Sequence, residues 1–67
     1  MPAHLMTLAE AAVYVGIPDG TLRAYRSAGT GPRSFKLGGR VFYKSDDLDQ
    51  WLEAQYRATV RGDGVPA

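Results

Sequence analysis

Glycines divide the first two thirds of this 67-residue chain into short segments. Gly16 and Gly29 each end a run with helical spacing, and Gly38-Gly39 separates two runs of residues that favour strands. Glycine ends helices and forms tight turns because it adopts left-handed backbone conformations without strain. The sequence therefore predicts two short helices followed by a β-hairpin.

The first helix is predicted to begin after Thr7. Thr7 and Glu10 have the spacing of a capping box, in which each side chain accepts a hydrogen bond from the other residue's backbone N–H. Apolar residues then recur three and four positions apart and form one stripe along a helix of about two turns. The stripe consists of Leu8, Ala11, Ala12 and Val15.

A second helix is predicted from about Asp19 to Ala28, after the break at Gly16-Ile17-Pro18. Asp19 is a favourable N-cap residue, and Leu22 and Tyr25 lie on the same side of the expected helix. The two helices are therefore joined by a tight turn.

The predicted hairpin spans residues 35–43. A two-residue turn would place Lys36 opposite Val41, whereas a three-residue loop, Gly38-Gly39-Arg40, aligns the apolar residues on one face. We therefore predict the longer loop, with Leu37 opposite Val41 and Phe35 opposite Tyr43. Arg40 would then lie at the tip of the hairpin. The outer face would carry Ser34, Lys36, Phe42 and Lys44.

A third helix is predicted from Ser45 to roughly Ala58. Ser45 provides a hydroxyl cap, and Asp46 and Asp47 place negative charge at the positive end of the helix dipole. Trp51 has the largest apolar side chain and is expected to close the core against the first helix and the inner face of the hairpin.

The chain is long enough for one domain, which we predict to cover residues 1–60, with a disordered tail at 61–67. A domain of this size buries only about 60% of the surface that its unfolded chain exposes. A deep substrate cavity is therefore not expected.

Composition also limits the chemistry of the chain. There is no Cys, and the single His is His4, so neither a disulfide framework, a structural zinc site nor a nucleophile–base pair can be assembled. We expect no enzyme activity, no metal and no cofactor, and we attribute the acidic cluster of Asp46, Asp47, Asp49 and Glu53 to helix capping and a solvated face. Neither a membrane span nor a secretory leader is recognised, which predicts a cytoplasmic protein.

Positive charge is concentrated in one segment. Residues 19–44 contain six of the eight Lys and Arg residues and a single acid, a local charge of +5, while the rest of the chain sums to −4. The overall charge of +1 conceals this asymmetry. A basic patch on a helix and a neighbouring hairpin is typical of nucleic-acid binding.

The predicted order of helix, tight turn, helix, basic hairpin and helix is that of a small winged helix-turn-helix, mainly α with one β-hairpin. Short motifs follow one another in a specific order along about residues 5 to 54. They are Leu8-Ala9-Glu10-Ala11-Ala12, Gly16-Ile17-Pro18, Thr21-Leu22-Arg23, Tyr25-Arg26, Gly29, Gly31-Pro32, Lys36-Leu37-Gly38-Gly39-Arg40-Val41, Tyr43 and Asp47-Leu48-Asp49-Gln50-Trp51-Leu52.

This series resembles the excisionase-like DNA-binding domains, which are related to the N-terminal domain of MerR regulators. The resemblance implies that the second helix enters the major groove and that the hairpin wing follows the DNA backbone or an adjacent minor groove. It also implies a place of action on the DNA of a bacterial or phage-infected cell.

Candidate contacts on the second helix are Thr21, Arg23, Tyr25 and Arg26. Arg can bind guanine with two hydrogen bonds, which makes Arg23 and Arg26 candidates for reading bases. The Thr21 hydroxyl either positions a phosphate or bonds to its own backbone. The Tyr25 ring is expected to pack in the core, and its hydroxyl could reach a phosphate.

Candidate contacts on the wing begin with Arg40, whose glycine neighbours leave room for it to enter a narrow groove. Arg33, Lys36 and Lys44 flank the wing and are predicted to bind phosphates. The alternative for Arg23 and Arg26 is an ordinary solvated helix face, and the alternative for Arg40 is a turn that needs a polar residue. Arg33, Lys36 and Lys44 could be isolated surface cations.

Two residues depart from the resemblance. Gly20 stands where relatives usually carry a long polar or basic residue, so either the helix starts later or its backbone approaches DNA closely. Phe42 points outward in the predicted register, which indicates either a different register or a contact with a neighbouring protomer or the rest of this small protein.

Three functions remain open. The first is sequence-specific binding of double-stranded DNA by an excisionase that helps an integrase, with possible cooperative self-association on DNA. The second is a small MerR-like transcription regulator with the same DNA-reading surface. The third is a protein-interaction module whose basic patch binds an acidic partner.

Overall fold

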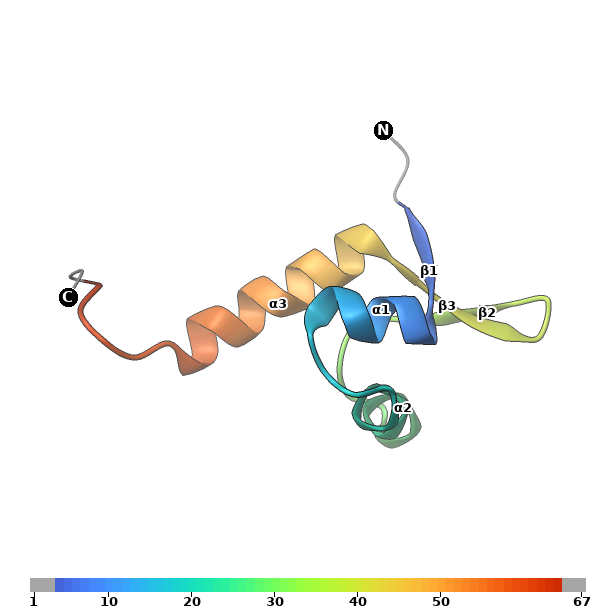
Figure 1. The fold of residues 1–67 in the computed structure, drawn as a ribbon, viewed down its shortest axis with the longest axis horizontal. Coiled ribbons are helices and arrows are strands. Elements are labelled where there is room, and N and C mark those ends of the chain that lie inside the picture. Colours follow the sequence, from blue (N-terminus) through green and yellow to red (C-terminus); the bar gives the residue numbers. More distant parts are fainter. Residues whose placement is uncertain (1–3, 65–67) are drawn as a thin grey trace.

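The computed structural model describes residues 4–64, which contain three helices and three strands (Figure 1). The first helix, α1 (Leu8–Val15), begins with the predicted capping box. Glu10 N donates to Thr7 Oγ1 at 3.2 Å, and Thr7 N donates to Glu10 Oε1 at 2.8 Å. Gly16 ends the helix with φ of 82°. The sequence signals for this helix are confirmed at both ends.

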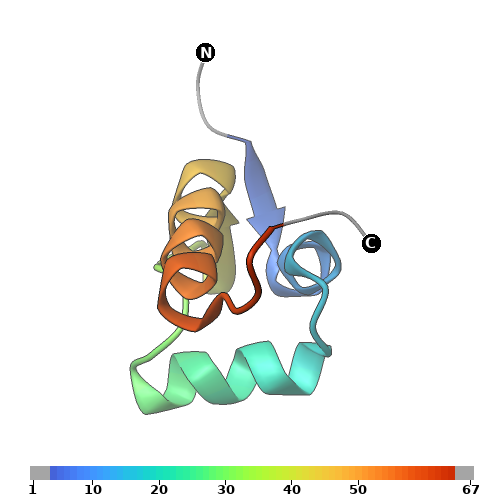
Figure 2. The same cartoon turned by 90° about the vertical axis from the view of Figure 1, so that its left-hand side faces the viewer.

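The second helix, α2 (Asp19–Ala28), also has its predicted length and ends at Gly29, with φ of 76°. Its N-cap is Pro18 and not Asp19, and no side chain caps it. Asp19 is instead the first helical residue, where its negative charge still suits the helix dipole. α2 crosses beneath α1 and α3, which leaves one of its faces directed away from the body of the protein (Figure 2).

The strands form one antiparallel sheet in the order β1 (Leu5–Thr7), β3 (Arg40–Lys44), β2 (Phe35–Leu37). β1 was not predicted. It is three residues long, and its partner β3 is distant in the sequence, with Leu5 opposite Lys44 and Thr7 opposite Phe42. Neither a turn signal nor alternation could reveal so short a strand.

The predicted hairpin is present, but its predicted register is wrong. β2 and β3 pair Phe35 with Phe42 and Leu37 with Arg40, so the turn consists of Gly38 and Gly39 alone. Their φ values are 59° and 82°, the two consecutive positive angles that a tight type I′ turn requires. Arg40 therefore begins β3 and is not the tip residue.

The observed register redistributes the side chains between the two faces. Tyr43 is fully buried and Val41 partly buried against the core, as predicted. Phe42 lies on the opposite face, as predicted, but Phe35 lies there too, with ring centroids 6.5 Å apart. Because neighbouring residues alternate, Lys36 shares the face of Val41, which corrects its predicted outer position.

The core lies between α1, α2, the sheet and the start of α3 (Ser45–Thr59). Ser45 is inside this helix and Lys44 is its N-cap; the Ser45 hydroxyl accepts a hydrogen bond from His4 N at 3.1 Å instead of capping the helix. The core residues are Met6, Ala11, Ala12, Leu22, Tyr43 and Leu48.

Trp51 is only partly buried and is not among these core residues. Its ring lies against Tyr25 of α2, with centroids 6.0 Å apart, so it packs beside α2 and not at the predicted place. The fully buried Leu48 and Tyr43 belong to the core where Trp51 was expected. From residue 53 onward every residue of α3 is exposed, and the helix extends beyond the rest of the fold (Figure 1).

The arrangement is that of a small winged helix-turn-helix, with α1 and α2 as the helix pair and β2–β3 as the wing. Within the predicted tail, residues 61–64 belong to no helix or strand, and residues 65–67 lie outside the described part. In residues 4–64 we found no helix with the length and apolar character needed to span a bilayer.

Candidate nucleic-acid interface

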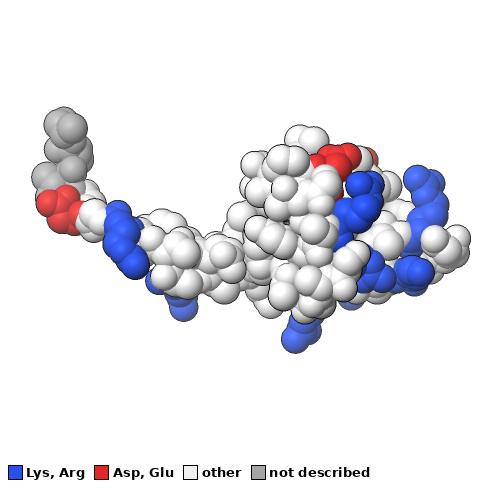
Figure 3. Space-filling model, turned by 90° about the horizontal axis from the view of Figure 1, so that it is seen from below, with Lys and Arg blue, Asp and Glu red and all other residues white. Residues whose placement is uncertain are grey.

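The basic side chains gather at the hairpin end of the molecule, with a smaller group toward the C-terminal end (Figure 3). Among residues 4–64 the only salt bridge joins Arg57 to Glu53 on α3, at 2.9 Å. The cations of α2 and of the wing therefore form no ion pair within the described part of the chain. Unpaired cations on one surface attract an anionic partner.

Arg23 and Arg40 are brought together by the fold. Arg23 is exposed on α2, Arg40 is exposed at the start of β3, and both line one open hollow of about 350 Å³. The N-terminal turn of α1 and Val41 complete its walls. This hollow therefore connects α2 with the wing, as expected if both contact the same partner.

Arg26 is arranged differently from Arg23. It is partly buried, and its Nη1 donates to Ser34 Oγ at 2.6 Å, which ties the last turns of α2 to the residue before β2. A guanidinium held at the base of the wing cannot extend freely toward a base edge. Its predicted role as a base-reading residue is therefore less favoured by the geometry than that of Arg23.

Ser34 was not predicted as a member of the candidate site. Its hydroxyl orients Arg26, and the Tyr43 hydroxyl lies beneath it, buried and without a hydrogen-bond partner of good geometry among the described residues. Burial raises the pKa of Tyr43, while the nearby Ser34 hydroxyl and Arg26 guanidinium oppose that rise. No sequence motif connects Ser34 with Arg26, so only the fold could identify this contact.

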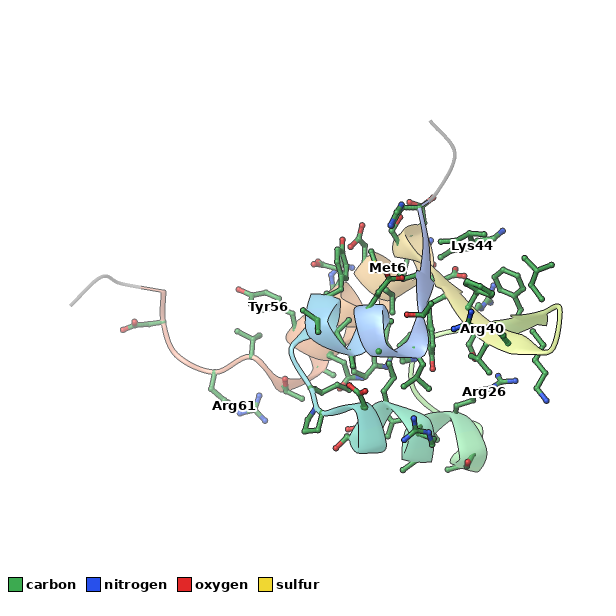
Figure 4. The ribbon with its side chains drawn as sticks, turned by 45° about the vertical axis from the view of Figure 1, so that its right-hand side comes forward. Met6, Arg26, Arg40, Lys44, Tyr56 and Arg61 are labelled. Atoms are coloured by element: carbon green, nitrogen blue, oxygen red, sulfur yellow. The ribbon has the colours of Figure 1, made fainter. Side chains whose placement is uncertain are left out.

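Arg33, Lys36 and Lys44 are all exposed but do not form one group. Arg33 lies in the loop between α2 and β2, close to Arg26, since both line a second hollow. Lys36 lies on the edge strand of the wing. Lys44 lies at the junction of β3 with α3, on the other side of the sheet region from Arg26 (Figure 4).

Thr21 and Tyr25 are partly buried members of α2. The Thr21 backbone N–H donates to Pro18 O at 3.1 Å, which closes the first turn. The Tyr25 ring packs against Trp51, and a Cβ on Gly31 would lie only 2.8 Å from Tyr25 Cβ. Tyr25 is therefore a packing residue, and Gly31 lets the following loop approach it closely.

A comparison with protein-family models matches residues 5–56 to a family described as a helix-turn-helix domain. The match covers α1, α2, the wing and most of α3. The chain belongs to this family of small, excisionase-like helix-turn-helix domains. None of the curated proteins compared with the chain matched it.

Helix-turn-helix domains bind DNA, so the family supports DNA as the partner of this chain. The family is typically non-enzymatic. Within residues 4–64, no group of three or more His, Cys, Asp or Glu side chains is arranged to hold a metal ion.

Proposed function

We propose that this helix-turn-helix domain binds a specific double-stranded DNA site through α2 and the wing together. The observation that carries the proposal is the hollow shared by Arg23 and Arg40, because it makes one surface of the helix and the hairpin. In this arrangement α2 lies in the major groove, Arg23 reads a base edge, and Arg40 follows the minor groove or backbone beside it.

The remaining candidates hold the protein on DNA without reading sequence. Arg33 and Lys36 are exposed beside α2 and the wing and bind phosphates. Lys44 lies farther from α2 and contributes least. About five phosphate contacts correspond to a log–log salt slope of about −4 to −5.

Gly20 becomes informative in this proposal. α2 begins at Asp19, so the helix does not start after Gly20. A Cβ at this position would meet no atom within 4 Å, and the residue does not require a left-handed conformation. The fold itself therefore gives no reason for glycine, which supports a close approach of the helix backbone to DNA.

The finer role that we propose is that of an excisionase, which binds beside an integrase and favours excision of a mobile element. The small winged fold supports it, because the chain belongs to a family of excisionase-like helix-turn-helix domains. Cooperative self-association on DNA is part of this proposal, with the outward-facing Phe35 and Phe42 as a candidate contact.

The test has two stages. Selection of bound duplexes from a random pool should yield a defined site, and titration at several salt concentrations should give the steep slope. Arg23→Ala and Arg40→Ala should each weaken binding, whereas the control Arg57→Ala should not, because Arg57 lies on the exposed end of α3. Absence of duplex binding at low salt would contradict the proposal and favour a protein partner.

The second stage adds the chain to an excision reaction that contains an integrase from the same genome and a DNA substrate in which the element is still flanked by its two junctions with host DNA. An excisionase raises the yield of excised circles. Binding to a promoter site with no effect on excision would contradict the excisionase role and assign the chain to transcription regulation.

A further inference from the structure

We propose that the loop after α2 forms a phosphate-binding niche, in which Arg26 and Arg33 hold one backbone phosphate of the DNA. The niche is an open hollow of about 220 Å³ lined by Arg26, Arg33, Ser34 and the residues of the Gly29–Pro32 loop. The inference rests on the proposed function, since it assigns a position on the DNA to residues of the same surface.

The first observation is an uncompensated charge. Arg26 is partly buried, yet no carboxylate within the described residues pairs with it. Its one side-chain partner is the neutral Ser34 hydroxyl. Placing a cation away from water without a counter-ion is costly, and an anion entering the niche would remove that cost.

The second observation is that Arg26 is already oriented. A guanidinium has five N–H donors in a rigid fork, and the hydrogen bond to Ser34 uses one of them. The remaining donors stay available to a phosphate, whose oxygens accept such paired hydrogen bonds well. Because Ser34 fixes one side of the fork in advance, less conformational entropy is lost when the anion binds.

The third observation is that the loop is shaped around α2. Gly31 has φ of 77°, and a Cβ there would overlap Tyr25 Cβ. Glycine therefore allows the loop to lie directly on α2, which places the exposed Arg33 close to Arg26. Two cations and the hydroxyl residues Thr30 and Ser34 then line one hollow, and no acidic side chain of residues 4–64 is among its lining residues.

The position of the niche identifies the anion as a DNA phosphate. α2 has ten residues, which corresponds to about 15 Å of helix. A major groove is about 12 Å wide, so a helix lying in it reaches the phosphates of the flanking strands with its ends. The niche lies at the C-terminal end of α2, where such a row of phosphates would pass.

The niche also changes the role of Arg26. It was a candidate for reading bases, but the niche makes it a phosphate anchor that fixes the register of α2 in the groove. Ser34 is then a positioning residue that acts through Arg26. Sequence discrimination falls mainly to Arg23, which is exposed and has no side-chain hydrogen bond in the described part of the chain.

The experiment replaces single phosphates of the selected duplex with neutral methylphosphonates and compares the wild type with Arg26→Gln and Arg33→Gln. At one or two adjacent positions the wild type should lose about tenfold in affinity, while the variants, which have already lost the contact, should lose less than about twofold. Arg57→Gln is the matched control and should follow the wild type at every position.

Ser34→Ala separates positioning from charge. In this variant, the methylphosphonate at the same position should cost less affinity than it costs the wild type. The salt slope should stay unchanged, because Arg26 keeps its charge. Thermal denaturation of each variant shows that it is folded, and Arg33→Gln tests the niche even if Arg26→Gln unfolds, because Arg33 is exposed.

If the wild type and both variants lose the same affinity at every methylphosphonate position, the niche proposal is wrong, while the proposed DNA binding remains intact. If the wild type binds no duplex at all, the proposed function fails first. Inorganic phosphate alone should bind only weakly. Its binding can be followed by NMR through the amide shifts of Gly29, Thr30 and Gly31. Saturation at micromolar concentration without coupling to any duplex phosphate would identify a free-anion site and overturn the proposal.

Discussion

The helices α1 and α2 have similar lengths and pack against each other, but they are stabilised in different ways. α1 is closed by a reciprocal capping box and buries Ala11 and Ala12 completely. α2 has no side-chain cap and buries only Leu22 completely. The comparison indicates that α1 is specified by its own sequence, whereas α2 depends mainly on the packing of Leu22, with Tyr25 partly buried beside it, and leaves the side that carries Arg23 exposed.

The largest effect should come from that single anchor. Leu22→Ala removes a fully buried side chain and should cost about 2 to 5 kcal/mol in the free energy of unfolding, measured by chemical denaturation. Leu8→Ala in α1 is the comparison, and it should cost clearly less because Leu8 is only partly buried. Equal losses would show that the two helices depend on packing to the same degree.

The next effect concerns the free face of α2. Arg23→Ala should reduce the free energy of DNA binding by about 1 to 3 kcal/mol and relax the preference at one base position. Lys36→Ala should weaken binding to all sequences alike and flatten the salt slope by about one unit. The measurement is titration of cognate and scrambled duplexes. Identical behaviour of the two variants on both duplexes would refute the assignment of α2 as the reading helix.

A smaller effect, with opposite signs in two assays, is expected at Gly20. Gly20→Ala should stabilise the fold by about 0.5 to 1 kcal/mol, because alanine favours a helix and its Cβ meets no other atom. The same change should weaken cognate DNA binding if the backbone approaches the duplex there. A variant that is more stable and binds DNA unchanged would remove the close approach from the proposal.

The smallest effect should be the pH dependence of the cap on α1. The hydrogen bond from Thr7 N is the main cause that lowers the pKa of Glu10 from its usual value. A lowered folded-state pKa stabilises the protein above the unfolded-state pKa, and this contribution is lost as the pH falls through the folded-state pKa. We expect the stability difference between wild type and Glu10→Gln to shrink in acid thermal melts.

Asp19→Asn is the matched control for this titration. It changes an acid in the first turn of α2, where no side-chain hydrogen bond closes the helix. We therefore expect Glu10→Gln to show the larger change of stability with pH of the two variants. A transition of the same size in both variants would show that the capping box contributes nothing specific.

The features predicted correctly are those that neighbouring residues determine. The capping box of Thr7 and Glu10 and the glycine helix ends needed no knowledge of the fold. The prediction of the hairpin register was wrong because it gave more weight to the alignment of apolar residues than to the turn. Gly38 and Gly39 adopt two consecutive positive φ angles, which suit a two-residue turn. With those angles the turn sets the register, and Phe35 and Phe42 meet on the outer face.

The candidate site shows the same division. Exposed basic residues were found from the charge asymmetry alone, and Arg23 and Arg40 do share one surface. The hydrogen bond from Arg26 to Ser34 and the packing of Tyr25 on Trp51 depend on how the loop crosses α2. A contact between residues on different elements leaves no periodic signal in the sequence, so these roles required the structure.

The pairing of β1 with β3 has a consequence for how the domain assembles. The hydrogen bonds between His4 and Ser45 span 41 positions of sequence, whereas both helices and the hairpin can form from neighbouring residues. Closing so long a loop costs chain entropy before the hydrogen bonds between β1 and β3 contribute any stabilisation. We expect β1 to dock late in folding and to open first. A bulky fusion before Leu5 would therefore loosen the wing while α1 and α2 stay formed, which makes the C-terminal end the better place for a label.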